Sequence, residues 1–246
     1  MELLFMVSIT NALTRFAYVL NGWKVVDQRG SIFVLRRNNT TMMCHGIGTI
    51  YSIANKDDYY TNNYWDLFAI LPGLYERPRV LMIGLGGGTI ARQLSALYSN
   101  LELDVVEIDG DIAELAKEHF DIGGARVIVG DGAKFVKESD SRYDLIILDA
   151  FEGSKIPKAF TSQDFFTDSY KLLSSDGIIA INSIEHTLDI GSLAKNYKTF
   201  SLKTQLASGN SIMICSKRMS ADQIKGRISN MHEAKESIKK AYALMG

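Results

Sequence analysis

Val80–Thr89 reads VLMIGLGGGT, and the segment DVVEIDGD follows with Glu107 at the end of its apolar run. A short aliphatic run that ends in clustered glycines predicts a strand and a tight turn, because glycine adopts backbone conformations that other residues avoid. Ile90–Tyr98 has a helical pattern, and the second apolar run ends in its acid about 20 residues after the glycines. These features predict the opening β-α-β unit of a nucleotide-binding α/β sheet, whose acid can accept hydrogen bonds from both ribose hydroxyls.

The spacing of the glycines separates two classes of ligand. Gly84, Gly86 and Gly88 satisfy GxGxG, whereas the GxGxxG fingerprint of dinucleotide sites would need a glycine where Thr89 stands. The observed spacing is typical of proteins that bind S-adenosylmethionine or a close relative, so we favour such a nucleoside over NAD. The alternative is a structural turn without a ligand, and Glu107 on the next predicted strand favours the nucleoside site.

Composition and charge exclude several other classes. The chain has 246 residues and a formal net charge of −1, which suits one large domain with a smaller one. No basic stretch alternates with aromatic residues, so we expect no nucleic-acid partner. Cys44 and Cys215 have no metal-ligand spacing and suggest no disulfide framework, and the four histidines are scattered. We therefore expect no metal site and two buried thiols in a reducing cytoplasm.

The N-terminal segment Met1–Leu20 is rich in large apolar residues, but Asn11 and Arg15 interrupt it. It lacks a basic region and a cleavage site of the signal-peptide type, and its apolar run is short for a membrane span. We expect an amphipathic helix that covers a sheet or forms a subunit contact. A signal peptide or membrane anchor is the less favoured alternative.

The rest of the chain reads as a small β module followed by an alternating α/β pattern. Trp23–Ile53 contains short strands separated by turn signals, which predicts antiparallel hairpins that must pack on another part of the protein. A helix that begins at Tyr64 is expected to stop near Pro72. Alternation then follows, with predicted strands Val80–Ile83, Leu103–Ile108, Ala125–Val129, Leu145–Leu148 and Gly177–Ser183 between predicted helices Ile90–Tyr98, Asp111–Phe120, Ala133–Ser139 and Ser162–Leu173.

Near-continuous apolar strands between amphipathic helices predict a parallel sheet that is covered on both faces. Ser211–Cys215 predicts one further strand, which could run antiparallel, and Ala221–Leu244 predicts a surface helix. The expected fold class is α/β with two domains. Residues 1–76 would form the N-terminal helix and small β domain, and residues 77–246 the nucleoside-binding domain.

Polar residues follow the predicted strands at the edge where open parallel sheets bind ligands. Asp131 and Gly132 precede a predicted helix, so Asp131 either caps that helix or accepts a hydrogen bond from an adenine amino group. Asp149 and Glu152 form a carboxylate pair that would bind an amine, or take a proton from an ammonium so that the free amine attacks. The alternative is a loop whose acids face water or cap the next helix.

Five segments carry a resemblance to a known family: VLMIGLGGGT, VVEID, VIVGDGAKFV, YDLIILDAFEG and ASGNSIMICSK. In the same order, they resemble the VLIIGGGDGG, strand-two acid, VxxGDGxxF, YDVIxxDSSDP and PSGQIGFMLCSK motifs of the spermidine synthase (polyamine aminopropyltransferase) family. The hairpins followed by Tyr64 and the LP dipeptide at 71–72 resemble its N-terminal domain. The resemblance implies a small β domain on a methyltransferase-like sheet, assembled into a homodimer or homotetramer.

The resemblance also implies roles for individual residues. Glu107 would hold the ribose, and Asp131 the adenine amino group, of decarboxylated S-adenosylmethionine, which is a co-substrate and not a permanently bound cofactor. Asp149 and Glu152 lie at the family's two active-site aspartates, the second of which helps to deprotonate the attacking amine, and Tyr64 lies at its substrate-site tyrosine. The remaining nucleoside-site residues are Gly84, Gly86, Gly88 and Gly132.

The chain departs from the family pattern at four positions. Gly87 replaces the aspartate that faces the aminopropyl amine, which weakens the rejection of intact S-adenosylmethionine. Trp65 replaces a glutamine or histidine, Asp66 a glutamate, and Leu206 a tyrosine. We expect an aminopropyltransferase that acts on a small-molecule amine. The alternatives are an S-adenosylmethionine-dependent methyltransferase and a non-catalytic relative that binds ligands or a partner subunit.

Overall fold

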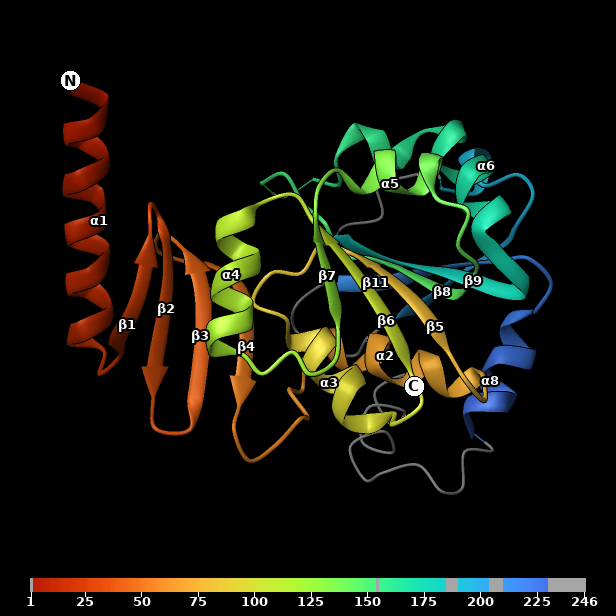
Figure 1. Ribbon diagram of the computed structural model, residues 1–246, viewed down its shortest axis with the longest axis horizontal. Helices are drawn as coiled ribbons and strands as arrows, with labels where there is room; N and C mark the ends of the chain where they lie inside the picture. The colour runs from red at the N-terminus through yellow and green to blue at the C-terminus, as the bar shows by residue number, and fades with distance from the viewer. Residues whose placement is uncertain (1, 154, 185–189, 204–209, 230–246) are drawn as a thin grey trace.

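The computed structural model describes residues 2–153, 155–184, 190–203 and 210–229, which form two sheets (Figure 1). A four-stranded antiparallel sheet in the order β1-β2-β3-β4 lies beside α1 (Glu2–Leu20). Its strands are β1 (Lys24–Arg29), β2 (Ile32–Arg37), β3 (Thr40–His45) and β4 (Thr49–Asn55). The hairpins predicted from the turn signals are therefore present.

The second sheet has seven strands in the order β10-β11-β9-β8-β5-β6-β7. Its strands are β5 (Arg79–Ile83), β6 (Glu102–Glu107), β7 (Arg126–Val129), β8 (Tyr143–Leu148), β9 (Leu173–Ile184), β10 (Lys198–Lys203) and β11 (Asn210–Ser216). Strands β5 to β9 pair in parallel, and β11 runs antiparallel to both β9 and β10. The predicted α/β fold and the antiparallel strand near the C-terminus are confirmed. The sequence pattern did not predict β10.

Helices cover both faces of this sheet. On one face lie α5 (Gly132–Glu138) and α6 (Gln163–Leu172), and on the other α2 (Trp65–Ile70), α3 (Thr89–Leu97), α4 (Gly110–His119) and α8 (Ala221–Ser229) (Figure 1). Successive residues of a strand face opposite sides, so Val80 and Met82 join one core, whereas Leu81 and Ile83 join the other. The near-continuous apolar strands of the sequence follow from this double burial. The short helix α7 (Ile190–Leu193) was not predicted. The predicted C-terminal helix Ala221–Leu244 is present as α8 over Ala221–Ser229, and its remaining residues lie outside the described ones.

The N-terminal helix α1 packs on the outer face of the small sheet, as the sequence predicted. The Tyr18 ring lies 6.4 Å from the Phe33 ring, and its hydroxyl donates a hydrogen bond to the carbonyl oxygen of Gly46 at 2.9 Å. The opposite side of the helix exposes four large apolar side chains, Leu13, Phe16, Val19 and Leu20. None of the described helices has the length and apolar character needed to cross a membrane.

The inner face of the small sheet shares a core with the large one. Ile32, Val34 and Met43 belong to the same buried cluster as Val80 and Leu115. Burial of each such side chain contributes about 1.5–3 kcal/mol, which is more than an exposed ion pair supplies. Apolar packing therefore fixes the small sheet on the α/β sheet.

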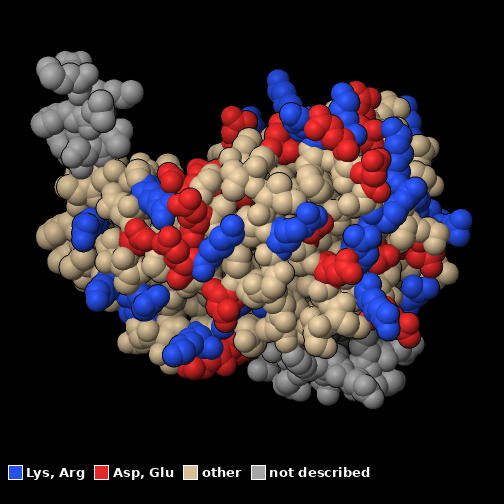
Figure 2. All heavy atoms as spheres, viewed as in Figure 1, with Lys and Arg blue, Asp and Glu red and all other residues tan. Residues whose placement is uncertain are grey.

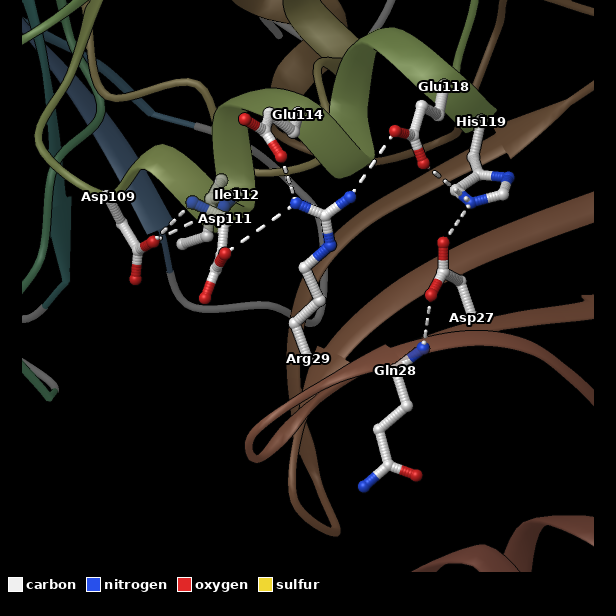
Figure 3. A network of polar contacts seen from close by, with 9 residues as sticks. All are labelled: Asp27, Gln28, Arg29, Asp109, Asp111, Ile112, Glu114, Glu118 and His119. Atoms are coloured by element: carbon white, nitrogen blue, oxygen red, sulfur yellow. Dashed lines mark hydrogen bonds and ion pairs between the residues drawn. The ribbon is translucent and has the colours of Figure 1, made fainter.

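A polar network also joins the two sheets, between β1 and α4 (Figure 3). Arg29 reaches Asp111, Glu114 and Glu118, and His119 Nε2 lies 2.9 Å from Asp27 Oδ2. The three carboxylates around Arg29 are more than half exposed, so each pair contributes about 1 kcal/mol or less. Figure 2 shows acidic and basic side chains interspersed over the visible face.

Helix α2 ends at Ile70, and Pro72 lies in the 3₁₀ turn Leu71–Leu74 that follows. Asp66 lies in the first turn of the helix and is 1% exposed. It accepts hydrogen bonds from the backbone N–H and hydroxyl of Thr61, from the N–H of Asn63 and from Nε2 of Gln93. Burial raises the pKa of Asp66 although these bonds favour its charged form. Asp66 therefore holds the segment before Tyr64 against α3.

We predict that Asp66→Ala lowers the free energy of unfolding by about 2–3 kcal/mol, because it leaves several buried donors without an acceptor. Urea denaturation measures the change. Asp140→Ala is the matched control, since Asp140 is an exposed aspartate and its loss should change stability little. Equal stability of the two variants would contradict the structural role of Asp66.

Candidate functional site

A cavity of about 570 Å³ opens at the carboxyl ends of β5, β6, β7 and β8 and is closed on one side by β4. The sheet order reverses between β5 and β8, which is where open α/β sheets bind ligands. Seven of the predicted site residues line this cavity: Tyr64, Gly84, Gly86, Glu107, Asp131, Gly132 and Asp149. Gly88 lies behind the loop and Glu152 lies at the rim, outside the lining.

The glycine loop after β5 needs its glycines for two physical reasons. Gly84 has φ +89°, and a side-chain Cβ there would lie 2.4 Å from the carbonyl oxygen of Asp149. Gly88 has φ +88°, and its Cβ would lie 2.4 Å from a methyl group of Ile122. Gly84 thus allows the loop to pass close to Asp149, and Gly88 allows α3 to begin against the core.

The small sheet holds this loop from the other side. Ser52 on β4 accepts a hydrogen bond from the N–H of Gly87 at 2.8 Å. Thr89, the first residue of α3, donates its hydroxyl to the carbonyl oxygen of Ile53 at 2.9 Å and accepts from the N–H of Ile53 at 3.1 Å. No local sequence pattern indicated these contacts, because they join residues more than 30 positions apart.

Glu107 ends β6 with its side chain 6% exposed at the cavity wall. Its Oε2 accepts a hydrogen bond from the N–H of Leu85 at 2.7 Å, and Oε1 accepts one from the N–H of Asp109 at 3.0 Å. A carboxylate oxygen accepts more than one hydrogen bond, so both atoms keep capacity for a ligand hydroxyl. Glu107 therefore ties the glycine loop to its own strand end.

Asp131 caps α5, as one of the two sequence interpretations proposed. Its Oδ1 accepts hydrogen bonds from the N–H groups of Ala133 at 2.8 Å and Lys134 at 3.1 Å. Within the described part of the chain, no donor contacts Oδ2 of this exposed residue. The cap and a contact between Oδ2 and a ligand amino group are therefore compatible.

Asp149 follows β8 at the floor of the cavity and lies between two donors. Asn182 Nδ2 donates to Oδ1 at 2.7 Å, and the Tyr64 hydroxyl lies 3.5 Å from Oδ1 and 3.4 Å from Oδ2. Burial raises the pKa of Asp149 to about 6, and the bonds from Asn182 and Tyr64 oppose the rise. Burial, followed by the Asp149 charge, raises the pKa of Tyr64 well above its usual value, so Tyr64 remains a neutral donor.

Glu152 is exposed, unlike Asp149. Its backbone pairs with that of Lys155, with N–H···O distances of 2.8 and 3.2 Å. Its neighbours Phe151 and Gly153 line the cavity, so Glu152 stands at the entrance. The two acids of the predicted pair thus occupy different environments.

Two residues that line the cavity were not predicted from the sequence as site residues. Asn182 on β9 is 1% exposed and bonds Asp149, and Asn210 at the start of β11 donates to Asn182 Oδ1 at 2.8 Å. A polar residue within the aliphatic run IIAINSI was the only available signal for Asn182. Asn210 lies inside the quoted segment ASGNSIMICSK, but its partner could be identified only from the pairing of β9 with β11.

The cavity has a strongly one-sided charge. Four carboxylates line it: Glu107, Asp109, Asp131 and Asp149. No lysine, arginine or histidine of the described residues contributes to the lining. Such a cavity attracts cations and repels anions.

The departures from the family pattern have distinct structural settings. Trp65 lines the cavity, is 4% exposed, and its ring lies 5.1 Å from that of Tyr64. Gly87 does not have positive φ, and its Cβ would lie 2.7 Å from Ser52 Cβ and 2.9 Å from Phe120 Cζ. The space beside Gly87 is therefore already filled. Leu206 lies outside the described residues.

A family model described as the spermine/spermidine synthase domain matches residues 66–217, well over half of the chain. The polyamine aminopropyltransferase of Vibrio vulnificus (strain CMCP6) is 31% identical over 158 residues, covering 58% of this chain and 53% of that protein. The probable polyamine aminopropyl transferase of Bifidobacterium longum (strain NCC 2705) is 34% identical over 135 residues, covering 54% of this chain and 30% of that protein. The chain therefore spans about half the length, or less, of these two relatives.

Solved structures share the fold at lower sequence identity. The spermidine synthase from Thermotoga maritima superposes with a TM-score of 0.65 and 20% identity, covering 91% of this chain and 84% of that one. A spermidine synthase in complex with the transition state analogue AdoDATO superposes with a TM-score of 0.64 and 21% identity, covering 90% of this chain and 85% of that one. Human methyltransferase-like protein 13 in complex with SAH superposes with a TM-score of 0.57 and 17% identity, covering 73% of this chain and 89% of that one.

We predict that Gly87→Ala lowers the free energy of unfolding by about 1–3 kcal/mol, because the added methyl group meets Ser52 and Phe120. Gly124→Ala is the matched control, since no heavy atom lies within 4 Å of a Cβ at that position. Thermal or urea denaturation compares the two variants. If Gly87→Ala were as stable as the control, an acidic side chain could be restored at this position, and the filled-space account would be wrong.

Proposed function

The chain belongs to the spermine/spermidine synthase family, and from this premise we propose that it is a polyamine aminopropyltransferase. It would transfer the aminopropyl group of decarboxylated S-adenosylmethionine to a small-molecule amine. Its relatives bear the name polyamine aminopropyltransferase, but the chain spans only about half of their length. The proposal therefore rests on the cavity itself.

The observation that carries the proposal is the set of four carboxylates around a cavity without a cationic side chain among the described residues. Decarboxylated S-adenosylmethionine carries a sulfonium and an ammonium and no anion, so this environment favours it. Intact S-adenosylmethionine adds a carboxylate, and a like-charge contact in a partly desolvated site costs several kcal/mol. The methyltransferase alternative would need a cation or a set of N–H donors for that carboxylate.

We assign the nucleoside to the side of the cavity formed by β5, β6 and β7. Glu107 would accept hydrogen bonds from the ribose hydroxyls, and Asp131 would use Oδ2 for the adenine amino group while Oδ1 caps α5. Gly84, Gly86 and Gly132 would allow the nucleoside to approach the backbone, and Gly88 would shape the loop from behind. No permanently bound cofactor is required.

The proposed reaction is a displacement at carbon. The free amine attacks the aminopropyl carbon next to the sulfonium, a C–N bond forms, and the C–S bond breaks with its electron pair remaining on sulfur as methylthioadenosine. Because the sulfonium is an activated leaving group, the protein supplies alignment and removal of the proton from the amine.

We assign the proton acceptor to Asp149 and retain Glu152 as a second catalytic candidate. Asp149 lies inside the cavity and has a pKa of about 6, which is close to the operating range of a general base. Tyr64 would remain protonated and help to orient the carboxylate. Glu152, exposed at the entrance, would attract the cationic amine and contribute to deprotonation when the amine passes it.

We also propose a homodimer or homotetramer, in which a second copy covers the exposed apolar side of α1 at Leu13, Phe16, Val19 and Leu20. Residues 1–76 would then supply the subunit contact and the wall behind the glycine loop, and residues 77–246 the nucleoside and amine sites. The free thiols Cys44 and Cys215, both buried, support a cytoplasmic location. No nucleic acid or membrane partner is part of this proposal.

We predict that Asp149→Asn lowers turnover about 10²–10⁴-fold, the usual contribution of a general base, and leaves methylthioadenosine affinity nearly unchanged. Release of methylthioadenosine from decarboxylated S-adenosylmethionine and a diamine measures turnover. The wild-type kcat/KM should fall as the pH decreases below about 6, because Asp149 must be ionised to accept a proton.

Glu152→Gln is the comparison variant and should lose less activity than Asp149→Asn, with a loss that shrinks at high pH where more free amine is present. A larger loss of activity in Glu152→Gln than in Asp149→Asn would instead identify Glu152 as the proton acceptor. No methylthioadenosine release by the wild type with any diamine would refute aminopropyl transfer.

A further inference from the structure

Three side chains form a continuous line of hydrogen bonds behind the proposed base. Asn210 Nδ2 donates to Asn182 Oδ1 at 2.8 Å, and Asn182 Nδ2 donates to Asp149 Oδ1 at 2.7 Å. We propose that Asn182 and Asn210 are positioning residues that fix the orientation of the Asp149 carboxylate toward the acceptor amine. This inference rests on the proposed function for its catalytic meaning, although the hydrogen-bond line can be tested without turnover.

The pairing of β9 with β11 places the two asparagines of this hydrogen-bond line next to each other. Asn182 on β9 lies opposite Ile212 on β11, and Asn210 is two residues before Ile212 on the same strand. Residues two apart on a strand point to the same face, so Asn210 and Asn182 are diagonal neighbours on one face of the sheet. The strand register therefore brings the two amides together.

Asn210 determines which end of the Asn182 amide faces the carboxylate. An asparagine amide offers an oxygen that accepts and a nitrogen that donates, and rotation by half a turn exchanges them. Because Asn210 donates to Asn182 Oδ1, the NH₂ group of Asn182 must point to Asp149. Asn182 is 1% and Asn210 9% exposed, so bulk water competes little for these bonds.

Asp149 is thereby held at both its backbone and its side chain. Its N–H donates to the carbonyl oxygen of Ile83 at 3.0 Å, which fixes the main chain beside β5. Asn182 then holds Oδ1, and among the described residues the hydrogen-bonding partner of Oδ2 is Tyr64, at the longer distance of 3.4 Å. Oδ2 is consequently the atom available to receive a proton from the amine.

The line of donors also favours the charged form of the carboxylate. Burial opposes ionisation of Asp149, whereas a short hydrogen bond from a correctly oriented amide supports it. A purely structural role for the asparagines would affect stability and leave the titration of Asp149 unchanged. This difference separates the two roles by experiment.

The experiment follows the Asp149 carboxyl carbon by ¹³C NMR during a pH titration of the free protein, with Asp149→Asn to assign the signal. In Asn182→Ala the midpoint should move from about 6 to about 7 or above, because a donor to the charged form is lost. Asn182→Asp keeps the side-chain shape and should move it at least as far, since it adds a like charge. Asn210→Ala should move it in the same direction by less, because the Asn182 amide is then free to rotate.

The control is Asn100→Ala, an exposed asparagine whose side chain donates to Glu76. It should leave the titration at its wild-type midpoint. The acid limb of kcat/KM should move with the NMR midpoint in each variant of Asn182. If Asn182→Ala fails to fold, the titration midpoint of Asp149 in the isosteric variant Asn182→Asp tests the proposal.

An unchanged midpoint in the folded Asn182 variants would overturn the proposal. A shifted midpoint in a protein that releases no methylthioadenosine would instead refute the proposed function and leave the orienting line intact. The two failures are therefore distinguishable.

Discussion

The contact between Gly84 and the backbone of Asp149 is the constraint on which the site depends. The N–H of Asp149 bonds to Ile83, and the missing side chain at Gly84 lets the glycine loop pass against the Asp149 carbonyl group. Gly84 and Asp149 directly follow β5 and β8, the two strands between which the sheet order reverses. One close backbone approach thus brings the glycine loop and the proposed base to the same cavity.

The rest of the structure stabilises that arrangement from three directions. Glu107 ties the loop to β6, Ser52 on β4 ties it to the small sheet, and Asn182 on β9 holds the Asp149 side chain. The small sheet is therefore part of the site, and the apolar core that fixes it to the α/β sheet has a functional role. Its contribution is to pre-organise the loop before a ligand binds, which lowers the entropic cost of binding.

Charge gives the cavity its chemical preference. Acids are costly to bury unless they are paired or hydrogen-bonded, and all four acids here accept hydrogen bonds. Asp109 caps α4 by accepting from the N–H groups of Asp111 and Ile112. Asp131 is exposed and caps a helix, Glu107 bonds to two backbone N–H groups, and Asp149 receives an amide and a phenol. In the described part of the cavity this concentration of negative charge has no cationic side chain to offset it. A cationic donor and a cationic acceptor would supply the missing charge.

Local sequence patterns predicted the local parts of this structure. The glycine spacing and the apolar run before Glu107 correctly predicted the first β-α-β unit of the large sheet, because both are set within one strand and turn. The Asn182–Asn210 pair and the Ser52–Gly87 bond depend on strand pairing and on the docking of two sheets, so no local pattern carried them. Strand β10 was not predicted because KTFSLK contains two apolar residues, Phe200 and Leu202, and lacks the apolar run of the other strands in the large sheet. Gly87 could be recognised as a departure, but its packed surroundings became visible only in three dimensions.

The central claim is that the acidic cavity selects a donor without a carboxylate. Isothermal titration calorimetry of the wild-type protein with decarboxylated and intact S-adenosylmethionine tests it most directly, with methylthioadenosine as the control for the nucleoside site. We predict that the decarboxylated form binds at least about tenfold more tightly, which corresponds to about 1.4 kcal/mol. Equal or tighter binding of the intact form, with methylthioadenosine bound normally, would contradict the account and favour methyl transfer.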